Sequence, residues 1–222
     1  MSINDNLQLI NKQLPEGVKL VAVSKTKPVE AIKEAYAAGQ RVFGENKAQE
    51  MALKYEQLPK DIEWHFIGHM QTNKVKYIAP FVSLIHSVDS LKVLKEINKQ
   101  AGKNNRVINC LLQFHIAEES TKFGLNIQEA EEIINHKNEF FNIRLVGVMG
   151  MATFTEDTEQ VRREFKQLRG YFDTLKKKFY SDDDSFTEVS MGMSGDYLIA
   201  IEEGSTLVRI GTLIFGKREY NK

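Results

Sequence analysis

Three kinds of side chain in this sequence have chemistry that could act on a single ligand. Lys25 ends an apolar run that begins at Lys19, Ser194 lies between two glycines, and Arg209 interrupts a second apolar run. A lysine amine that is partly removed from water can attack a carbonyl carbon and form an imine. A hydroxyl beside glycines can bind an anion, and a buried arginine needs an acceptor. Whether these groups act together depends on the elements that carry them.

Short apolar runs alternate with amphipathic segments along the whole chain, which predicts alternating strands and helices. The strands are predicted at residues 19–25, 41–44, 62–68, 83–88, 107–116, 144–149, 186–191 and 207–210. The helices are predicted at residues 3–14, 28–39, 47–58, 73–78, 91–100, 127–135, 158–178 and 197–202. Strands that are separated by helices pair in parallel, with the helices as crossovers.

This alternation predicts an α/β fold with a single (β/α)8 barrel over residues 1–222, because eight parallel strands close such a barrel and 222 residues suit it. The alternative is an open doubly wound sheet. Against that alternative, no G-x-G-x-x-G turn follows the first predicted strand. We therefore expect one barrel domain.

Active sites of such barrels lie at the carboxyl ends of the strands. Alternation along the first strand places Lys25 on the same face as Val23, so a barrel would direct Lys25 into its mouth. Ser194 follows the seventh strand and Arg209 lies in the eighth, and the loops after these strands often bind phosphate. Each residue also has an ordinary structural role open to it: a solvated lysine, a helix-capping serine or an arginine in a salt bridge. We expect Asp196, a carboxylate beside this loop, to face away from an anion.

An amine, a phosphate-binding loop and an arginine at one barrel mouth match the three reactive parts of pyridoxal 5′-phosphate (PLP). These parts are the aldehyde carbon, the phosphate and the ring nitrogen. The combination is more specific than any of its members. The residues therefore predict a PLP site, with another phosphorylated metabolite, bound without an imine, as an alternative.

The composition excludes several other classes of function. Lysine and arginine total 30 and aspartate and glutamate total 30, so the net charge predicts neither a nucleic acid nor a membrane as partner. The single cysteine, Cys110, lies in an apolar run and is expected to be a buried core residue. The first residues lack the basic flank and apolar core of a signal peptide. We expect a cytoplasmic protein.

The sequence also resembles a known family, the pyridoxal phosphate homeostasis proteins, which are PLP-binding relatives of the alanine racemase barrel. The matching motifs span nearly the whole chain and lie at residues 21–28, 43–50, 65–74, 122–124, 191–194 and 208–216. The resemblance implies a fold-type III PLP barrel without the second β-rich domain of alanine racemase.

The same resemblance implies roles for particular residues. Lys25 would form the imine, and Arg209 would face the ring nitrogen. Asn46 would lie beside the cofactor, and Met149 or Met151 would pack on the ring. The residues implied at the phosphate are Met193, Ser194, Gly211 and Thr212.

The resemblance implies a PLP carrier without strong catalytic activity of its own, which sequesters the cofactor and supplies it to PLP-dependent apoenzymes. Arginine keeps its proton, so Arg209 would leave the ring nitrogen unprotonated and weaken the ring as an electron sink. Lys25 is one candidate base, and no second acid–base residue is evident. The alternative is a PLP-dependent amino-acid racemase of low activity. We expect a monomer, and Lys122 is a candidate second aldehyde site for which a solvated surface lysine is the alternative.

Overall fold

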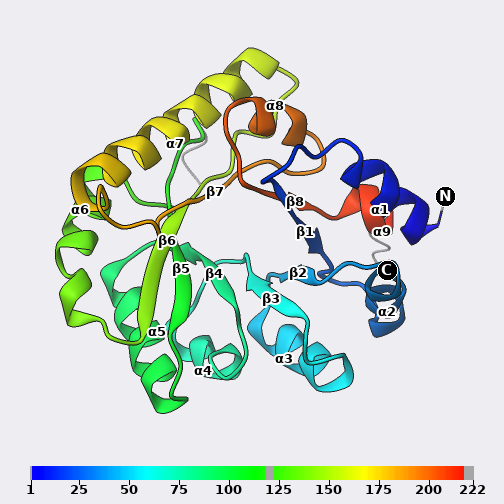
Figure 1. Cartoon of the computed structure of the whole chain (residues 1–222), viewed down its shortest axis with the longest axis horizontal. Helices are drawn as coiled ribbons and strands as arrows, with labels where there is room; N and C mark the ends of the chain where they lie inside the picture. The colour runs from blue at the N-terminus through cyan, green and yellow to red at the C-terminus, as the bar shows by residue number, and fades with distance from the viewer. Residues whose placement is uncertain (1, 119–122, 218–222) are drawn as a thin grey trace.

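The computed structural model describes residues 2–118 and 123–217. Eight parallel strands pair there in chain order, and β1 also pairs with β8, which closes the sheet into a barrel. Figure 1 shows the ring of strands inside a ring of helices. The strands are β1 (Lys19–Val23), β2 (Val42–Glu45), β3 (Glu63–Phe66), β4 (Leu84–Val88), β5 (Ile108–Gln113), β6 (Ile143–Met149), β7 (Glu188–Ser190) and β8 (Leu207–Ile210).

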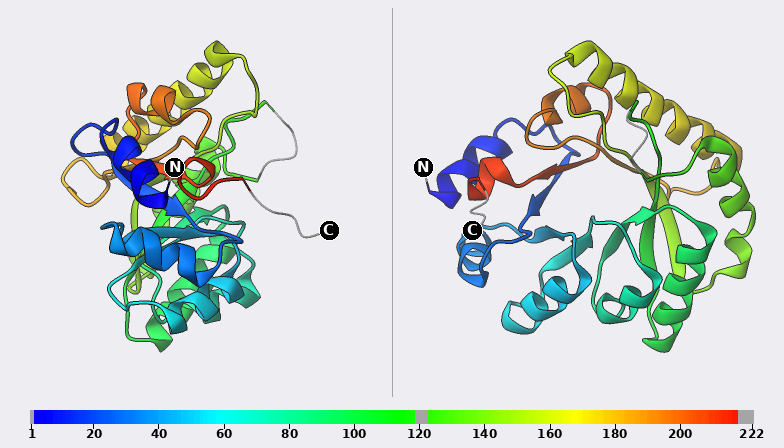
Figure 2. Two further views of the ribbon diagram at one scale, coloured as in Figure 1. Left: turned by 90° about the vertical axis from the view of Figure 1, so that its right-hand side faces the viewer. Right: turned by 180° about the vertical axis from the view of Figure 1, so that it is seen from behind.

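The helices lie outside the barrel, as the views from the side and from behind also show (Figure 2). Most of them connect consecutive strands, as parallel pairing requires. The α-helices are α1 (Ile3–Asn11), α2 (Val29–Ala37), α3 (Ala48–Gln57), α4 (Val75–Ile78), α5 (Leu91–Lys103), α6 (Ile127–Asn135), α7 (Thr158–Phe179), α8 (Tyr197–Glu202) and α9 (Thr212–Phe215). Two 3-10 helices are η1 (Thr72–Lys74) and η2 (Lys137–Glu139).

Capping residues fix the start of several helices. Ser2 accepts the amide hydrogen of Asp5 at α1, and Asn126 accepts that of Glu129 at α6, each within a reciprocal capping box. Asp157 caps α7, the longest helix. These caps satisfy amide groups that a helix start leaves without a partner inside the helix.

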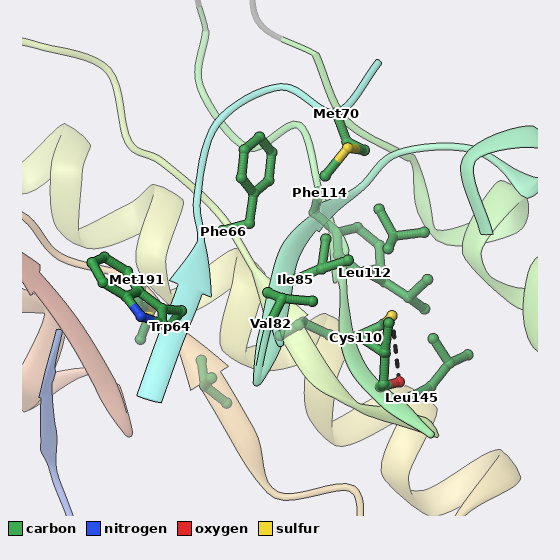
Figure 3. Close-up of a cluster of buried hydrophobic side chains, with 14 of the residues drawn as sticks. Trp64, Phe66, Met70, Val82, Ile85, Cys110, Leu112, Phe114, Leu145 and Met191 are labelled. Atoms are coloured by element: carbon green, nitrogen blue, oxygen red, sulfur yellow. Dashed lines mark hydrogen bonds between the residues drawn. The ribbon is translucent and has the colours of Figure 1, made fainter. Parts of the chain in front are cut away.

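Apolar side chains fill two regions, one between barrel and helices and one inside the barrel. Trp64 and Phe66 of β3 belong to the outer region, part of which Figure 3 shows around Ile85 and Cys110. The inner region is much smaller and comprises Val21, Leu84, Leu111, Val146, Met149 and Leu207. Because side chains alternate along a strand, His65 points to the opposite side of β3 from its neighbours Trp64 and Phe66.

The closed barrel confirms the predicted fold class and rules out the open sheet. Element boundaries shift by a few residues: β1 ends at Val23 rather than Lys25, and α1 ends at Asn11 rather than residue 14. The chain turns after β1 at Thr26, whose φ is +64°. The sequence did not predict α9, because four residues are too few to show a helical period.

Two smaller expectations concern Cys110 and membrane association. Cys110 is fully buried, and burial raises the pKa of its thiol, in agreement with the predicted core role. In residues 2–118 and 123–217, no helix combines the length and apolar character that crossing a bilayer requires.

Candidate functional site

A cavity of about 400 Å³ opens at the carboxyl ends of the strands. This volume lies in the range of small-molecule sites. Its walls come from the ends of β1 and β8, the loops after β3, β6 and β7, and the start of α7. Six of the seven predicted site residues line it, namely Lys25, Met193, Ser194, Arg209, Gly211 and Thr212.

Lys25 reaches the cavity because its two neighbours in the chain are fixed on the other side. The Ser24 hydroxyl is buried and donates to Oε1 of Glu45 at 2.6 Å. The Thr26 amide donates to Oε1 of Glu50 at 2.8 Å. With Ser24 directed outward, alternation turns Lys25 inward.

A buried lysine on α3 ties these anchors together. Nζ of Lys54 donates to the Ser24 carbonyl at 2.9 Å and to Oε1 of both Glu45 and Glu50 at 2.7 Å. Burial raises the pKa of Glu45, against the opposing effect of the Lys54 charge. Burial also acts to raise the pKa of Glu50, but the hydrogen bonds from Lys54 and Thr26 outweigh it and lower that pKa. A cationic side chain thus crosslinks the backbone of the Lys25 turn to two carboxylates.

The loop after β7 meets the end of β8, the strand that pairs with β1. Ser194 Oγ accepts the Gly211 amide hydrogen at 3.4 Å, which joins the two segments. A Cβ at Gly211 would lie 3.0 Å from the Val23 carbonyl oxygen, so glycine permits the end of β8 to approach β1 closely. A Cβ at Gly195 would meet nothing within 4 Å. The hydroxyls of Ser194 and Thr212, with amides close by, form a polar corner that suits an anion.

Asp196 is also among the residues that line the cavity. That its carboxylate faces away from a bound anion stays a prediction. Its Oδ1 accepts the amide hydrogen of Met193, three residues earlier in the sequence. That bond holds one carboxylate oxygen on the loop backbone.

Arg209 is 4% exposed and lies at the inner end of the cavity. Its guanidinium donates to Ser190 Oγ at 2.6 Å and to the Gly150 carbonyl at 3.1 Å, both neutral acceptors. Burial lowers the Arg209 pKa to about 10, with a small opposing effect from Asp196. Arg209 therefore keeps its proton at neutral pH, and these two bonds leave further N–H donors for a ligand.

Asn46, Met149 and Met151 were also predicted near the cofactor. Asn46 follows β2 and is not among the residues that line the cavity, but its Oδ1 is buried and has no hydrogen-bond partner within the described residues. Met151 lines the cavity, whereas Met149 is buried inside the barrel. Lys122 lies outside the described residues.

Several residues at the site carried no recognisable signal in the sequence. Lys27 and Ile67 also line the cavity, together with Thr153, Phe154 and Thr155 from the loop after β6. Lys54 stands four residues after Glu50 on a helix, a spacing typical of solvated ion pairs. The packing of α3 against the ends of β1 and β2 buries Lys54 and leaves Glu50 half-buried.

Comparison with known proteins agrees with the cavity and the barrel. The chain matches the family described as alanine racemase, N-terminal domain, over residues 1–219. A pyridoxal phosphate homeostasis protein of Aquifex aeolicus is 44% identical over 203 residues, which are 91% of this chain and 88% of that protein. Another, of Vibrio alginolyticus, is 39% identical over 235 residues and 99% of each chain.

A solved structure is also similar. PipY of Synechococcus elongatus, with PLP bound, is 34% identical and aligns with a TM-score of 0.89 over 97% of this chain and 100% of that one. The family resemblance noted from the motifs is thereby confirmed. The chain belongs to the pyridoxal phosphate homeostasis proteins, within the alanine racemase N-terminal domain family.

Proposed function

We propose that this chain, residues 1–222 as one barrel domain, binds PLP on Lys25 and acts in PLP homeostasis. The observation that carries the proposal is the single cavity that Lys25, Ser194 and Arg209 line together. They come from sequence positions far apart, and each suits a different part of PLP. The relatives named as PLP homeostasis proteins and the PLP-bound PipY structure support the same assignment.

The residues present fit the cofactor at four points. Lys25 would hold the aldehyde carbon as an imine, and Arg209 would donate to the ring nitrogen. Met193, Ser194, Gly211 and Thr212 would hold the phosphate, with the open space beside Gly195 available to it. The unpartnered Oδ1 of Asn46 would lie beside the ring, where a polar group of the cofactor would satisfy it.

We favour a carrier over an enzyme. When bound, PLP supplies a ring that withdraws electrons from an attached carbon, most strongly when its nitrogen is protonated. Arg209, which can only donate, would hold that nitrogen as an unprotonated acceptor. Among the described residues that line the cavity, the titratable ones are Lys25, Lys27, Asp196 and Arg209.

These groups offer little for acid–base catalysis. Lys27 Nζ already donates to the carbonyls of Phe215 and Lys217, and Asp196 accepts the Met193 amide hydrogen. Lys25 would be occupied by the cofactor. The rival function is a PLP-dependent amino-acid racemase of low activity, with Lys25 as one base.

The proposal extends to partners and location. We propose that the protein works as a monomer in the cytoplasm and supplies PLP to apoenzymes. An opening between the loops that line the cavity would permit release of the cofactor.

Absorption spectroscopy tests the binding site. Purified protein mixed with PLP should turn yellow, and borohydride should fix the cofactor on Lys25. Lys25→Ala should abolish both signals. Lys33→Ala, which removes an exposed lysine of α2 outside the cavity, is the matched control and should leave both intact. A colourless wild-type protein would reject PLP in favour of another phosphorylated metabolite.

Two assays separate carrier from enzyme. In the first, holoprotein is mixed with a PLP-free aminotransferase, and recovered transaminase activity measures transfer. In the second, holoprotein is incubated with single L-amino acids while optical rotation is followed. Recovery of activity without racemisation supports the carrier, whereas racemisation that requires Lys25 would establish the enzyme.

A further inference from the structure

Behind Arg209, four polar side chains form a continuous chain of hydrogen bonds through the inside of the barrel. Nη1 of Arg209 donates to Ser190 Oγ at 2.6 Å. Ser190 Oγ lies 2.9 Å from Nδ1 of His86, and Nε2 of His86 lies 3.0 Å from Nδ1 of His65. Ser190 and His86 are fully buried, and His65 is 6% exposed.

This chain of hydrogen bonds crosses the interior of the barrel rather than following its wall. Ser190 lies on β7 and His86 on β4, and in the closed order β4 pairs with β3 and β5, while β7 pairs with β6 and β8. A side-chain bond between β4 and β7 must therefore pass through the interior. The surroundings there are apolar, because Leu84 and Leu207 belong to the inner core. Polar groups in such a place are costly unless they are bonded to one another.

The donors and acceptors run in one direction. Arginine can only donate, so Ser190 Oγ is the acceptor of its bond with Arg209. The serine hydroxyl hydrogen then has His86 Nδ1 as its acceptor. His86 must consequently carry its hydrogen on Nε2, which donates to Nδ1 of His65. His65 in turn carries its hydrogen on Nε2.

The opposite arrangement would leave a group unsatisfied. If Nδ1 of His86 donated to Ser190, the serine hydroxyl hydrogen would have no acceptor among the bonds that the structure shows for it. Burial also favours neutral rings: it lowers the pKa of His65 to about 3 and lowers that of His86 well below its usual range. Electrostatic interaction with His65 and the charge of Arg209 lower the His86 pKa further.

The far end of the chain reaches a second cavity. His65 helps to line a space of about 180 Å³ whose walls also include the polar residues Lys19, Glu63, Asn109 and Glu188. Lys19 and Glu63 begin their strands, so this space lies at the amino ends of the barrel, opposite the proposed cofactor site. The polar chain thus links the two ends of the barrel, with Arg209 at one end and a polar cavity at the other.

We propose that Ser190 and His86, supported by His65, are positioning residues that orient Arg209 toward the cofactor ring nitrogen. This inference rests on the proposed PLP site. The hydrogen-bond chain meets the guanidinium through the neutral Ser190 hydroxyl instead of a carboxylate. It therefore fixes the orientation of Arg209 without neutralising its charge. A fully charged and fixed donor keeps the ring nitrogen unprotonated, whereas an arginine held only by the Gly150 carbonyl would lose this orientation.

The test measures the ring nitrogen itself. Wild-type protein and variants are loaded with PLP that carries ¹⁵N in the ring, and the ¹⁵N chemical shift reports whether that nitrogen is protonated. We expect an unprotonated signal in the wild type. In Ser190→Ala and His86→Leu the signal should move toward the protonated value, and PLP should dissociate about tenfold faster, as for loss of one hydrogen bond to a charged group. His86→Gln should restore both, because its amide can accept from Ser190 and donate to His65.

Two controls separate positioning from general damage. Ser205→Ala also removes a buried hydroxyl beside β7 and β8, one that bonds to the Met191 and Leu207 carbonyls, and it should leave the ¹⁵N signal unchanged. Borohydride fixation on Lys25 is measured in every sample: its loss in the wild type would reject the PLP site itself. If fixation persists and the ring signal of both variants equals that of the wild type, or if the wild-type nitrogen is already protonated, the positioning role is wrong. Should His86→Leu fail to fold, Ser190→Ala alone decides the question.

Discussion

Ser194 gives the most direct test at the scale of single residues. Its hydroxyl lies in the polar corner formed by the ends of β7 and β8 and accepts the Gly211 amide hydrogen. If this corner binds the phosphate, Ser194→Ala removes a hydrogen bond to a charged group, which is worth about 1.5–3 kcal/mol. PLP affinity should fall roughly 10- to 100-fold. Equilibrium titration by absorbance measures it.

The same variant has an informative second readout. Fixation by borohydride on Lys25 should survive at saturating PLP, because Ser194 would hold the phosphate and Lys25 the imine, and both residues line the cavity. An unchanged affinity in Ser194→Ala would mean that the phosphate binds elsewhere.

At the scale of elements, the turn after β1 depends on the ion cluster beneath it. Lys54→Met leaves Glu45, a fully buried carboxylate, without its cation. Removing one partner of a buried pair costs about 3–5 kcal/mol, so the free energy of unfolding should fall by about this amount. Urea denaturation of the apoprotein measures the loss.

A double variant shows whether charge is the cause. Glu45→Gln in the Lys54→Met background removes the uncompensated charge and should recover part of the stability. If the double variant is no more stable than Lys54→Met, the loss comes from packing and the electrostatic account fails.

The loop after β6 has its own anchor, Glu164 of α7. Its carboxylate accepts the amide and hydroxyl hydrogens of Thr153 at 2.6 and 2.7 Å, and the amide hydrogen of Glu118 at 3.2 Å. Burial acts to raise the Glu164 pKa, but the Thr153 hydrogen bonds outweigh it and lower that pKa. A carboxylate with a lowered pKa stabilises the fold above its unfolded pKa, near 4.5, and this contribution is lost as pH falls through the folded value.

Glu164→Gln should therefore lower stability at pH 7 and flatten the acid dependence. Urea unfolding at pH 7 and at about pH 4 measures the free energy of unfolding of wild type and variant. The difference between the two proteins should be smaller at the lower pH. Because Thr153 and Phe154 line the cavity, PLP should also dissociate faster from the variant at pH 7. A gap of equal size at both pH values would show that ionised Glu164 does not anchor the loop.

At the scale of the whole molecule, PLP binding should stabilise the closed barrel. The cavity takes its walls from strands at both ends of the sequence, β1 and β8, and α1 is bonded to α9 through Asn6 and the Ile214 carbonyl at 3.0 Å. A ligand that binds only the folded state at 100 times its Kd adds about 2.7 kcal/mol. For a protein of this size, Tm should rise by roughly 5–10 °C.

Thermal unfolding with increasing PLP checks this linkage. The PLP-dependent rise in Tm should be mostly lost in Lys25→Ala and retained in Lys33→Ala. A rise of equal size in Lys25→Ala would show that the stabilisation comes from the phosphate alone, which inorganic phosphate would then reproduce.

The sequence alone was enough for the fold class and for most of the candidate site. Alternating apolar runs and amphipathic segments fixed the order of strands and helices, because each pattern repeats with the period of the element it forms. Lys25, Ser194 and Arg209 could be placed at one end of the barrel because parallel strands all finish at the same edge. Whether the phosphate, the ring and the imine occupy the predicted positions remains a prediction.

The tertiary structure alone decided which polar residues are buried together. Lys54 and Glu50 have the spacing of a surface pair, and His86 lies between Ile85 and Ser87 in a short strand. The sequence therefore does not reveal the partners of Lys54 or of His86. Their partners, Ser24 and Ser190, are 30 and 104 residues away. Contacts across a closed barrel depend on strand register and on which strands face one another, and no local period encodes either.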